Sequence, residues 1–279
     1  IVPPSISFVL LGAIVEISVG KLFLAGIVPG VIMFGTMFIL TWWICRSRGY
    51  PIEIRADWSE RRSALFDGSL ALVAPLIIVG SIIFGIATPT ESAAVAVAYV
   101  LLLGMVVYRN TSIRDVIEAA GNTAISTSVI MLTVATSKMF AWLAVHEQLG
   151  EILTSAMLTL TDNLYVLLFL INVLLLILGM FMEILPIMLI LAPVLFPMLG
   201  DLGVDPVHFG VVMVLNLMIG MITPPIGLNL FVISAIGKVG VIEIFREAVP
   251  YFLVLVGVLM LITYVPELTL TIPNAVFPQ

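Results

Sequence analysis

The residue types with the clearest chemical use gather around a proline pair, Pro224-Pro225, within the apolar stretch 207–236. Proline inside a helix lacks a backbone N–H and clashes with the carbonyl four residues earlier, at a cost of about 3 kcal/mol or more. In lipid, the carbonyls released by such a break find no water, so the break must be covered by protein or line a cavity. The sequence therefore predicts a broken helix over 207–236, with a binding site at the break.

The groups around this break suit a cation and an anion together. The end of the first half-helix, from Gly220 to Thr223, should carry unpaired carbonyls, and a hard cation such as sodium prefers oxygen ligands. The start of the second half-helix, from Ile226 to Asn229, should present N–H groups that attract an anion. The predicted ligands of such a cation are Asn216, Gly220 and Thr223, and the predicted substrate contacts are Thr223, Pro224 and Asn229.

A second interruption lies in the apolar stretch 163–199, whose centre reads LGMFMEILPIM. A full crossing and return would favour a basic turn inside the cell, but this turn has no Lys or Arg and carries Glu183. A re-entrant hairpin that turns at depth fits better, and an ionisable group at depth is a candidate functional group. We therefore predict Gly179 and Glu183 as further ligands of the cation. The alternative is a shallower hairpin with a solvated Glu183.

Another proline pair, Pro3-Pro4, begins a segment that parallels the first. Residues 2–30 read VPPSISFVLLGAIVEISVGKLFLAGIVPG, and residues 223–251 read TPPIGLNLFVISAIGKVGVIEIFREAVPY. Both contain Pro-Pro, an apolar half-helix, Gly-Lys and a proline near the head of the next span. Ser5, beside the first pair, can add a side-chain oxygen and is predicted as a substrate contact.

Composition indicates which solvent surrounds these elements. Of the 279 residues, 62% are hydrophobic and only 10% charged, against about 25% charged in a soluble domain. A stretch of about 18 or more apolar residues can cross the hydrocarbon core of a bilayer. We expect an all-α polytopic membrane protein, with apolar stretches at 22–44, 66–87, 91–108, 118–145, 163–180, 184–199, 207–236 and 248–265.

Basic residues predict the orientation of these stretches. Nine of the 11 Lys and Arg residues fall in the connections 46–65, 109–117 and 238–247, which the positive-inside rule places in the cytoplasm. The half-helix after Pro3-Pro4 then points outward, and the one after Pro224-Pro225 points inward. Such an inverted repeat with matching broken helices indicates a transporter whose substrate and ion site lies near the membrane midplane. The alternative is that each proline pair is a packing kink.

Several segments resemble the large membrane subunit of tripartite ATP-independent periplasmic (TRAP) transporters. They are FGIATPTESAAVAVAYVLLLG at 84–104, DPVHFGVVMVLNLMIGMITPPIGLNLFVISAI at 205–236, and the run from IVPPSI to GKLFLAGIVPG at the start. The resemblance covers almost all of the chain and corresponds to roughly the C-terminal two-thirds of such a subunit. A first re-entrant hairpin is expected to precede it in the whole protein.

The resemblance implies secondary transport in the bacterial inner membrane, driven by a sodium gradient, with an elevator motion of a transport domain. The substrate would be an organic anion such as a C4-dicarboxylate or a sialic acid. A periplasmic substrate-binding protein would deliver it, and a small membrane subunit would complete the scaffold. The family often has FMDP at the hairpin tip, so the sequence around Glu183 departs from that pattern.

The predicted spans and the inverted repeat divide the chain into four parts. Residues 1–45 are expected to end the first inverted repeat, and 46–65 to form a cytoplasmic connection with an interfacial helix. Residues 66–265 would form the second repeat, with the hairpin 163–199 and the broken helix 207–236. Residues 266–279 would be a periplasmic tail.

Two rival functions can be weighed from the same residues. A membrane enzyme is not expected, because His146-Glu147 is followed by Gln148, Leu149 and Gly150 rather than completing a zinc-binding H-E-x-x-H motif. A related cation-coupled carboxylate carrier that needs no binding protein is the closer alternative. Sodium is expected as the coupling ion, with no other cofactor and no nucleic-acid partner.

Overall fold

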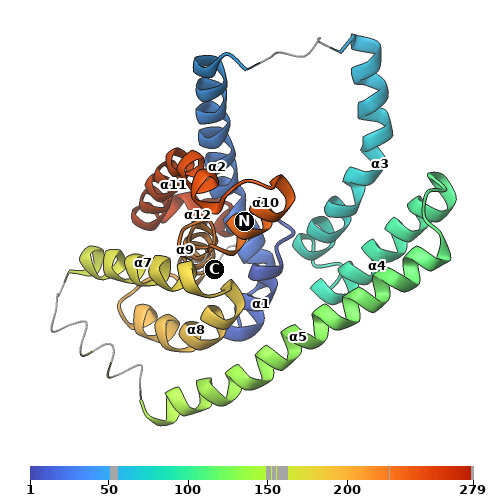
Figure 1. Cartoon of the computed structure of the whole chain (residues 1–279). Coiled ribbons are helices and arrows are strands. Elements are labelled where there is room, and N and C mark those ends of the chain that lie inside the picture. Colours follow the sequence, from blue (N-terminus) through green and yellow to red (C-terminus); the bar gives the residue numbers. More distant parts are fainter. Residues whose placement is uncertain (51–55, 149–151, 153–154, 156–162, 226, 278–279) are drawn as a thin grey trace. The chain divides into compact units, whose positions relative to one another are not determined.

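A computed structural model (Figure 1) describes the chain except for residues 51–55, 149–151, 153–154, 156–162, 226 and 278–279. The described residues form helices and contain no strand, which confirms the predicted all-α class. In chain order the helices are α1 (Ile6–Val15), α2 (Val19–Arg48), α3 (Trp58–Ile83), α4 (Pro89–Leu102), the π-helical turn η1 (Leu103–Val107), α5 (Ile113–His146), α7 (Leu164–Phe181), α8 (Ile184–Asp201), α9 (Pro206–Gly220), α10 (Leu228–Gly237), α11 (Val241–Tyr264) and α12 (Glu267–Val276).

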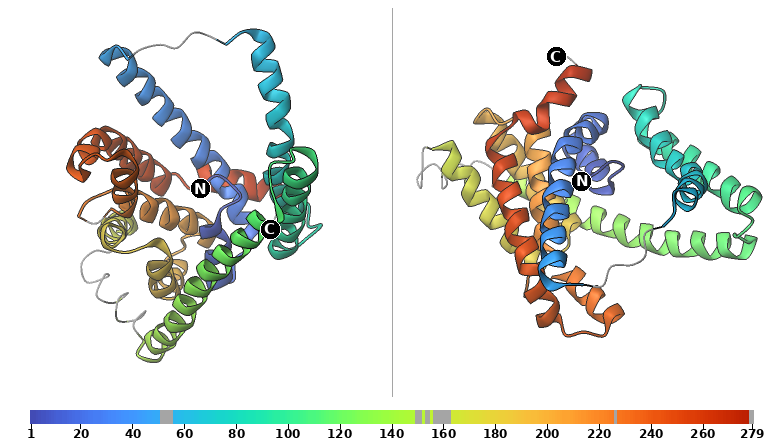
Figure 2. Two further views of the ribbon diagram at one scale, coloured as in Figure 1. Left: turned by 45° about the vertical axis from the view of Figure 1, so that its right-hand side comes forward. Right: turned by 90° about the horizontal axis from the view of Figure 1, so that it is seen from above.

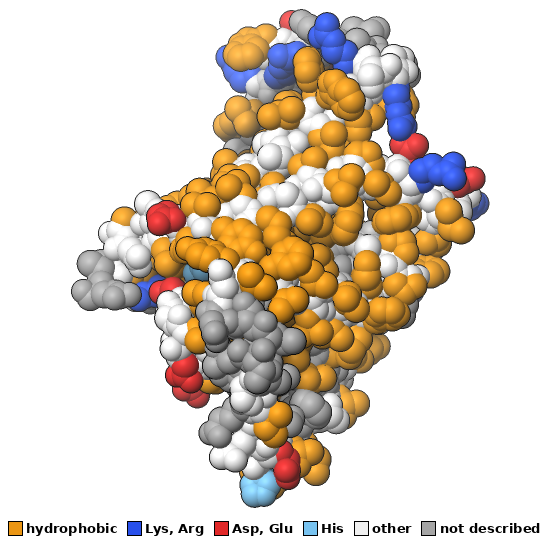
Figure 3. All heavy atoms as spheres, turned by 90° about the vertical axis from the view of Figure 1, so that its left-hand side faces the viewer, with side chains coloured by type: hydrophobic (Ala, Val, Ile, Leu, Met, Phe, Trp, Pro, Cys, Tyr) orange, Lys and Arg blue, Asp and Glu red, His pale blue; other side chains and the backbone are white. Residues whose placement is uncertain are grey.

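The predicted polytopic character is also confirmed. Among the described residues, 6 helical segments are long and apolar enough to cross a membrane: Val19–Arg48, Pro89–Val107, Ile113–Thr136, Leu164–Phe181, Ile184–Asp201 and Val241–Tyr264. The two parts of α3, Trp58–Phe66 and Gly68–Ile83, meet at a bend of 42° and together form a further candidate. Hydrophobic side chains cover much of the face shown in Figure 3, as expected where lipid replaces water.

The chain divides into two compact units, of which residues 43–132 form one. Here α3 and α4 pack together, and buried Ser92 accepts a hydrogen bond from Ser81 at 2.8 Å. Helix α4 begins at Pro89, directly after Thr88. The reason is a capping box: Thr88 caps the helix, Glu91 bonds back to the Thr88 N–H, and proline suits the first helical position.

The second unit comprises residues 1–42 and 133–279 and has α9 at its centre. Helices α1, α7, α8, α11 and α12 all pack against α9 (Figures 1 and 2), and every residue from Val207 to Gly220 except Met218 is buried. Helix α9 is apolar all round, as expected of a helix enclosed by others. It carries the first half of the predicted broken helix into the middle of this unit.

Helix boundaries agree with both predicted interruptions. The stretch 207–236 is split into α9 and α10, and 163–199 is split into α7 and α8 with Met182 and Glu183 in extended conformation between them. Each arm of this second pair has 18 residues, or about 27 Å of helix, which is close to the thickness of the hydrocarbon core. This length is compatible with a full crossing as well as with a re-entrant hairpin, so the re-entrant path stays a prediction. Helices α2 and α3 both reach into the predicted connection 46–65, because polar residues continue a helix beyond its apolar part.

Candidate functional site

The break after α9 is built from tight turns around the proline pair. The Thr223 N–H donates to the carbonyl of Gly220 at 2.9 Å, and the Thr223 hydroxyl donates to that of Ile219, also at 2.9 Å. The Pro224-Pro225 peptide bond is cis, as is Pro3-Pro4. Gly227 then caps α10 with φ of 48°, where a Cβ would lie 2.9 Å from the Thr223 carbonyl oxygen. Only glycine fits this left-handed, crowded position.

Some backbone N–H groups at the break already donate hydrogen bonds within the protein, which changes the prediction that they are free to bind an anion. The N–H groups of Gly227 and Asn229 were expected to face an anion, but they donate to the carbonyls of Met180 and Met221, each at 3.3 Å. Closing the chain between α9 and α10 consumes these donors. The carbonyls of Gly220 and Met221 each accept one backbone hydrogen bond, and a carbonyl has a second lone pair that can coordinate a cation.

Two glycines predicted as sodium ligands meet at a helix crossing. A Cβ on Gly220 would lie 2.7 Å from the Cα and the carbonyl carbon of Gly179, closer than real Cβ atoms approach such atoms. The absence of side chains therefore lets the end of α7 touch the end of α9, backbone to backbone. Together with the bond from Gly227 to Met180, this contact brings the hairpin tip and the helix break to one place.

The remaining predicted residues differ in their surroundings. Thr223 and Ser5 are buried, with Ser5 at the N-cap of α1, whereas Asn229 is exposed and Pro224 is half-buried. Glu183 is the N-cap of α8 and is exposed, without a side-chain capping bond. Asn216 is fully buried and lies one helical turn before Gly220, on the same face of α9, because residues four apart share a face.

A buried polar network extends from Asn216, and the sequence analysis did not find its other members. Asn216 Nδ2 donates to Asn172 Oδ1 at 2.6 Å, and Asn172 Nδ2 donates to Thr263 Oγ1 at 3.1 Å. Nearby, the ring of His208 joins the Thr263 carbonyl at 3.2 Å to the Thr269 hydroxyl at 2.8 Å. Because a carbonyl only accepts, His208 Nε2 must be the donor.

This network ties four helices together, since Asn172 lies on α7, Asn216 and His208 on α9, Thr263 on α11 and Thr269 on α12. All five side chains are buried. The signal in the sequence was a polar residue in an otherwise apolar helix, as at Asn172. Such a residue must find a partner in a low-dielectric interior.

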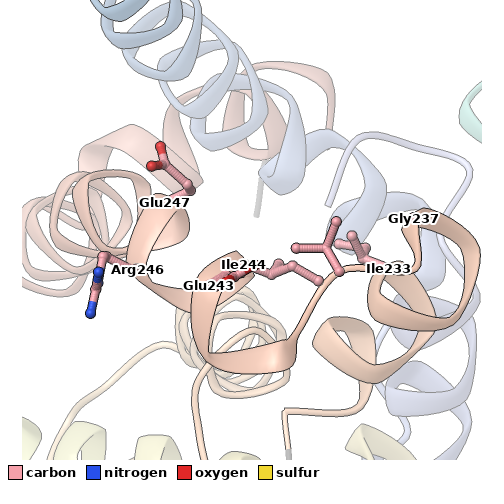
Figure 4. A pocket seen from close by; sticks show the side chains of 7 residues that line it. Ile233, Gly237, Glu243, Ile244, Arg246 and Glu247 are labelled. Atoms are coloured by element: carbon pink, nitrogen blue, oxygen red, sulfur yellow. The ribbon is translucent and has the colours of Figure 1, made fainter.

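A cavity of about 510 Å³ lies where α10 turns into α11 (Figure 4). Its lining consists of Ile233, Gly237, Val239, Glu243, Ile244, Arg246 and Glu247. None of these was predicted as a ligand, and the predicted sodium ligands lie elsewhere, at the crossing of α7 and α9.

Among the described residues no group of three or more His, Cys, Asp and Glu side chains is arranged to hold a metal ion.

Comparisons with known proteins give a consistent picture. The family described as the DctM component of tripartite ATP-independent periplasmic transporters matches residues 1–268. The chain is 41% identical to the sialic acid TRAP transporter large permease protein SiaM of Vibrio cholerae, over 98% of this chain and 64% of that protein. It is 36% identical to the C4-dicarboxylate TRAP transporter large permease protein DctM of Rhodobacter capsulatus, over 92% and 58%.

A third relative is the 2,3-diketo-L-gulonate TRAP transporter large permease protein YiaN of Escherichia coli, 37% identical over 96% of this chain and 63% of that protein. The chain thus spans about three-fifths of the length of these relatives, namely 64%, 58% and 63%. All three are named as transporter permeases and not as enzymes.

Proposed function

Because the chain belongs to the DctM family of tripartite ATP-independent periplasmic transporters, we propose that it forms part of a large permease for sodium-coupled uptake of an organic anion. The match of residues 1–268 to that family carries the proposal. The family resemblance seen in the sequence is thereby confirmed.

The substrate class in this proposal is a carboxylate. Sialic acid, C4-dicarboxylates and 2,3-diketo-L-gulonate, which name the three relatives above, all carry a carboxylate group. We propose that a periplasmic binding protein delivers the anion, that a small membrane subunit completes the assembly, and that all of it resides in the bacterial inner membrane.

The sodium site is proposed at the crossing of α7 and α9. Backbone oxygens near Gly179 and Gly220, the Thr223 hydroxyl and the Asn216 amide supply neutral oxygen donors of the type that a hard cation binds. Exposed Glu183 at the adjacent hairpin tip adds a negative charge. The positive charge of bound sodium would in turn favour binding of the substrate's carboxylate group, so the cation and the substrate anion would bind together.

The likeness of the two Pro-Pro segments supports an inverted repeat, and hence alternating access by movement of one part against another. We propose the elevator form of this motion, with α7, α8, α9 and α10 in the moving part together with α1.

Transport by the complete permease tests this function. The whole large subunit, its small subunit and its binding protein are placed in vesicles, and uptake of labelled sialic acid and succinate is measured with and without a sodium gradient. We expect uptake of a carboxylate only with both sodium and the binding protein. Uptake that is equal with and without the sodium gradient would overturn the proposed coupling. Uptake without the binding protein would favour the alternative, a cation-coupled carboxylate carrier that needs no binding protein.

A further inference from the structure

The amide of Asn216 has one orientation that agrees with its neighbours. Thr263 Oγ1 donates its single proton to the carbonyl of Leu259 at 2.8 Å, so toward Asn172 this hydroxyl is an acceptor. Asn172 therefore turns Nδ2 toward Thr263 and Oδ1 toward Asn216. Asn216 Nδ2 donates to that Oδ1 at 2.6 Å and to the Asn172 carbonyl at 3.0 Å.

This chain of donors leaves Asn216 Oδ1 unpaired. Across the described part of the chain, it is the only fully buried side-chain nitrogen or oxygen without a hydrogen-bond partner. A buried acceptor left in this state costs about 1–3 kcal/mol. Reversing the amide would give no relief, because Oδ1 would then face two acceptor oxygens of Asn172. The atom that remains is electron-rich, which suits a cation and disfavours a carboxylate.

We propose that Thr263 and Asn172 are positioning residues that hold the Asn216 amide with its oxygen, rather than its nitrogen, directed at the coupling sodium ion. This inference rests on the proposed sodium-coupled function and assigns roles to two residues outside the predicted site. Thr263 lies on α11 and Asn172 on α7, so the last long helix sets the orientation of a ligand on α9 through the first arm of the hairpin.

Removing the Thr263 hydroxyl tests the proposal with little change in shape. In Thr263→Val, Asn172 no longer has an acceptor for Nδ2 and can reverse its amide, which allows Asn216 to present its nitrogen to the cation. In vesicles with the complete transporter, we expect the sodium concentration for half-maximal uptake to rise about tenfold, the effect of one charged hydrogen bond. The maximal rate should stay near that of the unmodified protein.

Thr263→Ser is the matched control, because serine keeps both hydrogen bonds of the hydroxyl. Its sodium dependence should be that of the unmodified transporter. A shift in Thr263→Ser as large as that in Thr263→Val would overturn the positioning role, since the hydroxyl would then not be the cause.

Asn172→Leu provides a second variant if Thr263→Val does not fold. It removes the side-chain acceptor Oδ1 but keeps the backbone carbonyl that also accepts from Asn216 Nδ2, and it should shift the sodium dependence in the same direction. Sodium binding is also measured without transport, as the rise in melting temperature on adding sodium chloride compared with choline chloride, because a ligand of the native state stabilises it. That rise should be smaller in both variants. Unchanged sodium dependence in both by both measurements would overturn the inference.

Thr223→Ala separates this inference from the proposed function. If Thr223→Ala raises the sodium requirement while Thr263→Val and Asn172→Leu leave it unchanged, the positioning role fails and sodium coupling stands. If the unmodified transporter takes up substrate equally in sodium and choline, the proposed coupling itself fails.

Discussion

The two segments that follow the proline pairs share a backbone pattern but differ in burial. Helices α1 and α10 each have 10 residues and each end at a residue with positive φ, Glu16 at 56° and Lys238 at 52°. Each is followed after a short turn by a long helix, α2 or α11, with a proline in its interior, Pro29 or Pro250. The Gly-Lys pairs differ in position, since Gly20-Lys21 lies in the first turn of α2 and Gly237-Lys238 at the end of α10, but the order of helices after each proline pair is the same.

The neighbours of the two helices differ. Helix α1 packs against α8 and α9, and it buries Ser7, Phe8, Leu11 and Gly12. Helix α10 packs against α11, while its Phe231, Val232, Ile233 and Ile236 are exposed in the described structure. A local pattern thus determines where a helix begins and ends, whereas burial depends on which other elements reach it.

The comparison is tested most directly by the side of the membrane that each helix end faces. We expect Ser18→Cys, after α1, to react with a membrane-impermeant thiol reagent from the periplasm, and Gly240→Cys, after α10, only from the cytoplasm. Both positions are exposed, and the single native cysteine is first removed as Cys45→Ala. Labelling in intact and inverted vesicles is compared, with detergent-solubilised protein as the control. Reaction of both from the same side would rule out opposed orientations.

A second test asks whether both proline pairs create functional breaks. Replacing Pro224 and Pro225 with alanine should let the helix continue and pair its carbonyls within itself, which removes ligands of the proposed ion site. We expect sodium-dependent uptake by the complete transporter to fall about tenfold or more, the effect of losing one charged interaction or several. Replacing Pro3 and Pro4 should act similarly if the breaks are equivalent.

Uptake as a function of sodium concentration, together with the melting temperature in detergent, distinguishes this outcome from a packing kink. A kink alone would alter the melting temperature and leave the sodium dependence of uptake intact.

The third test concerns burial at matching positions. Leu11 and Ile233 are each the sixth residue of their helix, but Leu11 is 0% exposed and Ile233 is 50% exposed. Leu11→Ala should lower the free energy of unfolding by about 2–5 kcal/mol because it leaves a cavity. Ile233→Ala should change it by no more than about 0.5 kcal/mol. Denaturant titration of the complete permease in micelles measures both, and equal losses would show that α10 is as enclosed as α1.

The sequence determined the broad architecture and the position of each interruption. Apolar length identified the spans, and prolines, together with polar residues such as Glu183, identified where α7 and α9 end. These are local properties, because the cost of burying a free backbone group or a proline in a helix depends on a few neighbouring residues. For the same reason Asn216, Gly220 and Thr223 could be identified from their closeness in sequence to the proline pair.

Only the tertiary structure decided which faces meet. Gly179 touches Gly220, Asn216 bonds to Asn172, and Asn172 bonds to Thr263, and each of these pairs joins helices distant in sequence. In a soluble protein the polar face of a helix identifies its buried side. Helices α7 and α9 carry apolar residues on nearly all sides, so periodicity carries little information about their packing. Two of the N–H groups expected to be free after Pro225, those of Gly227 and Asn229, are engaged for a related reason. Gly227 donates to Met180, an acceptor that the fold supplies from another helix.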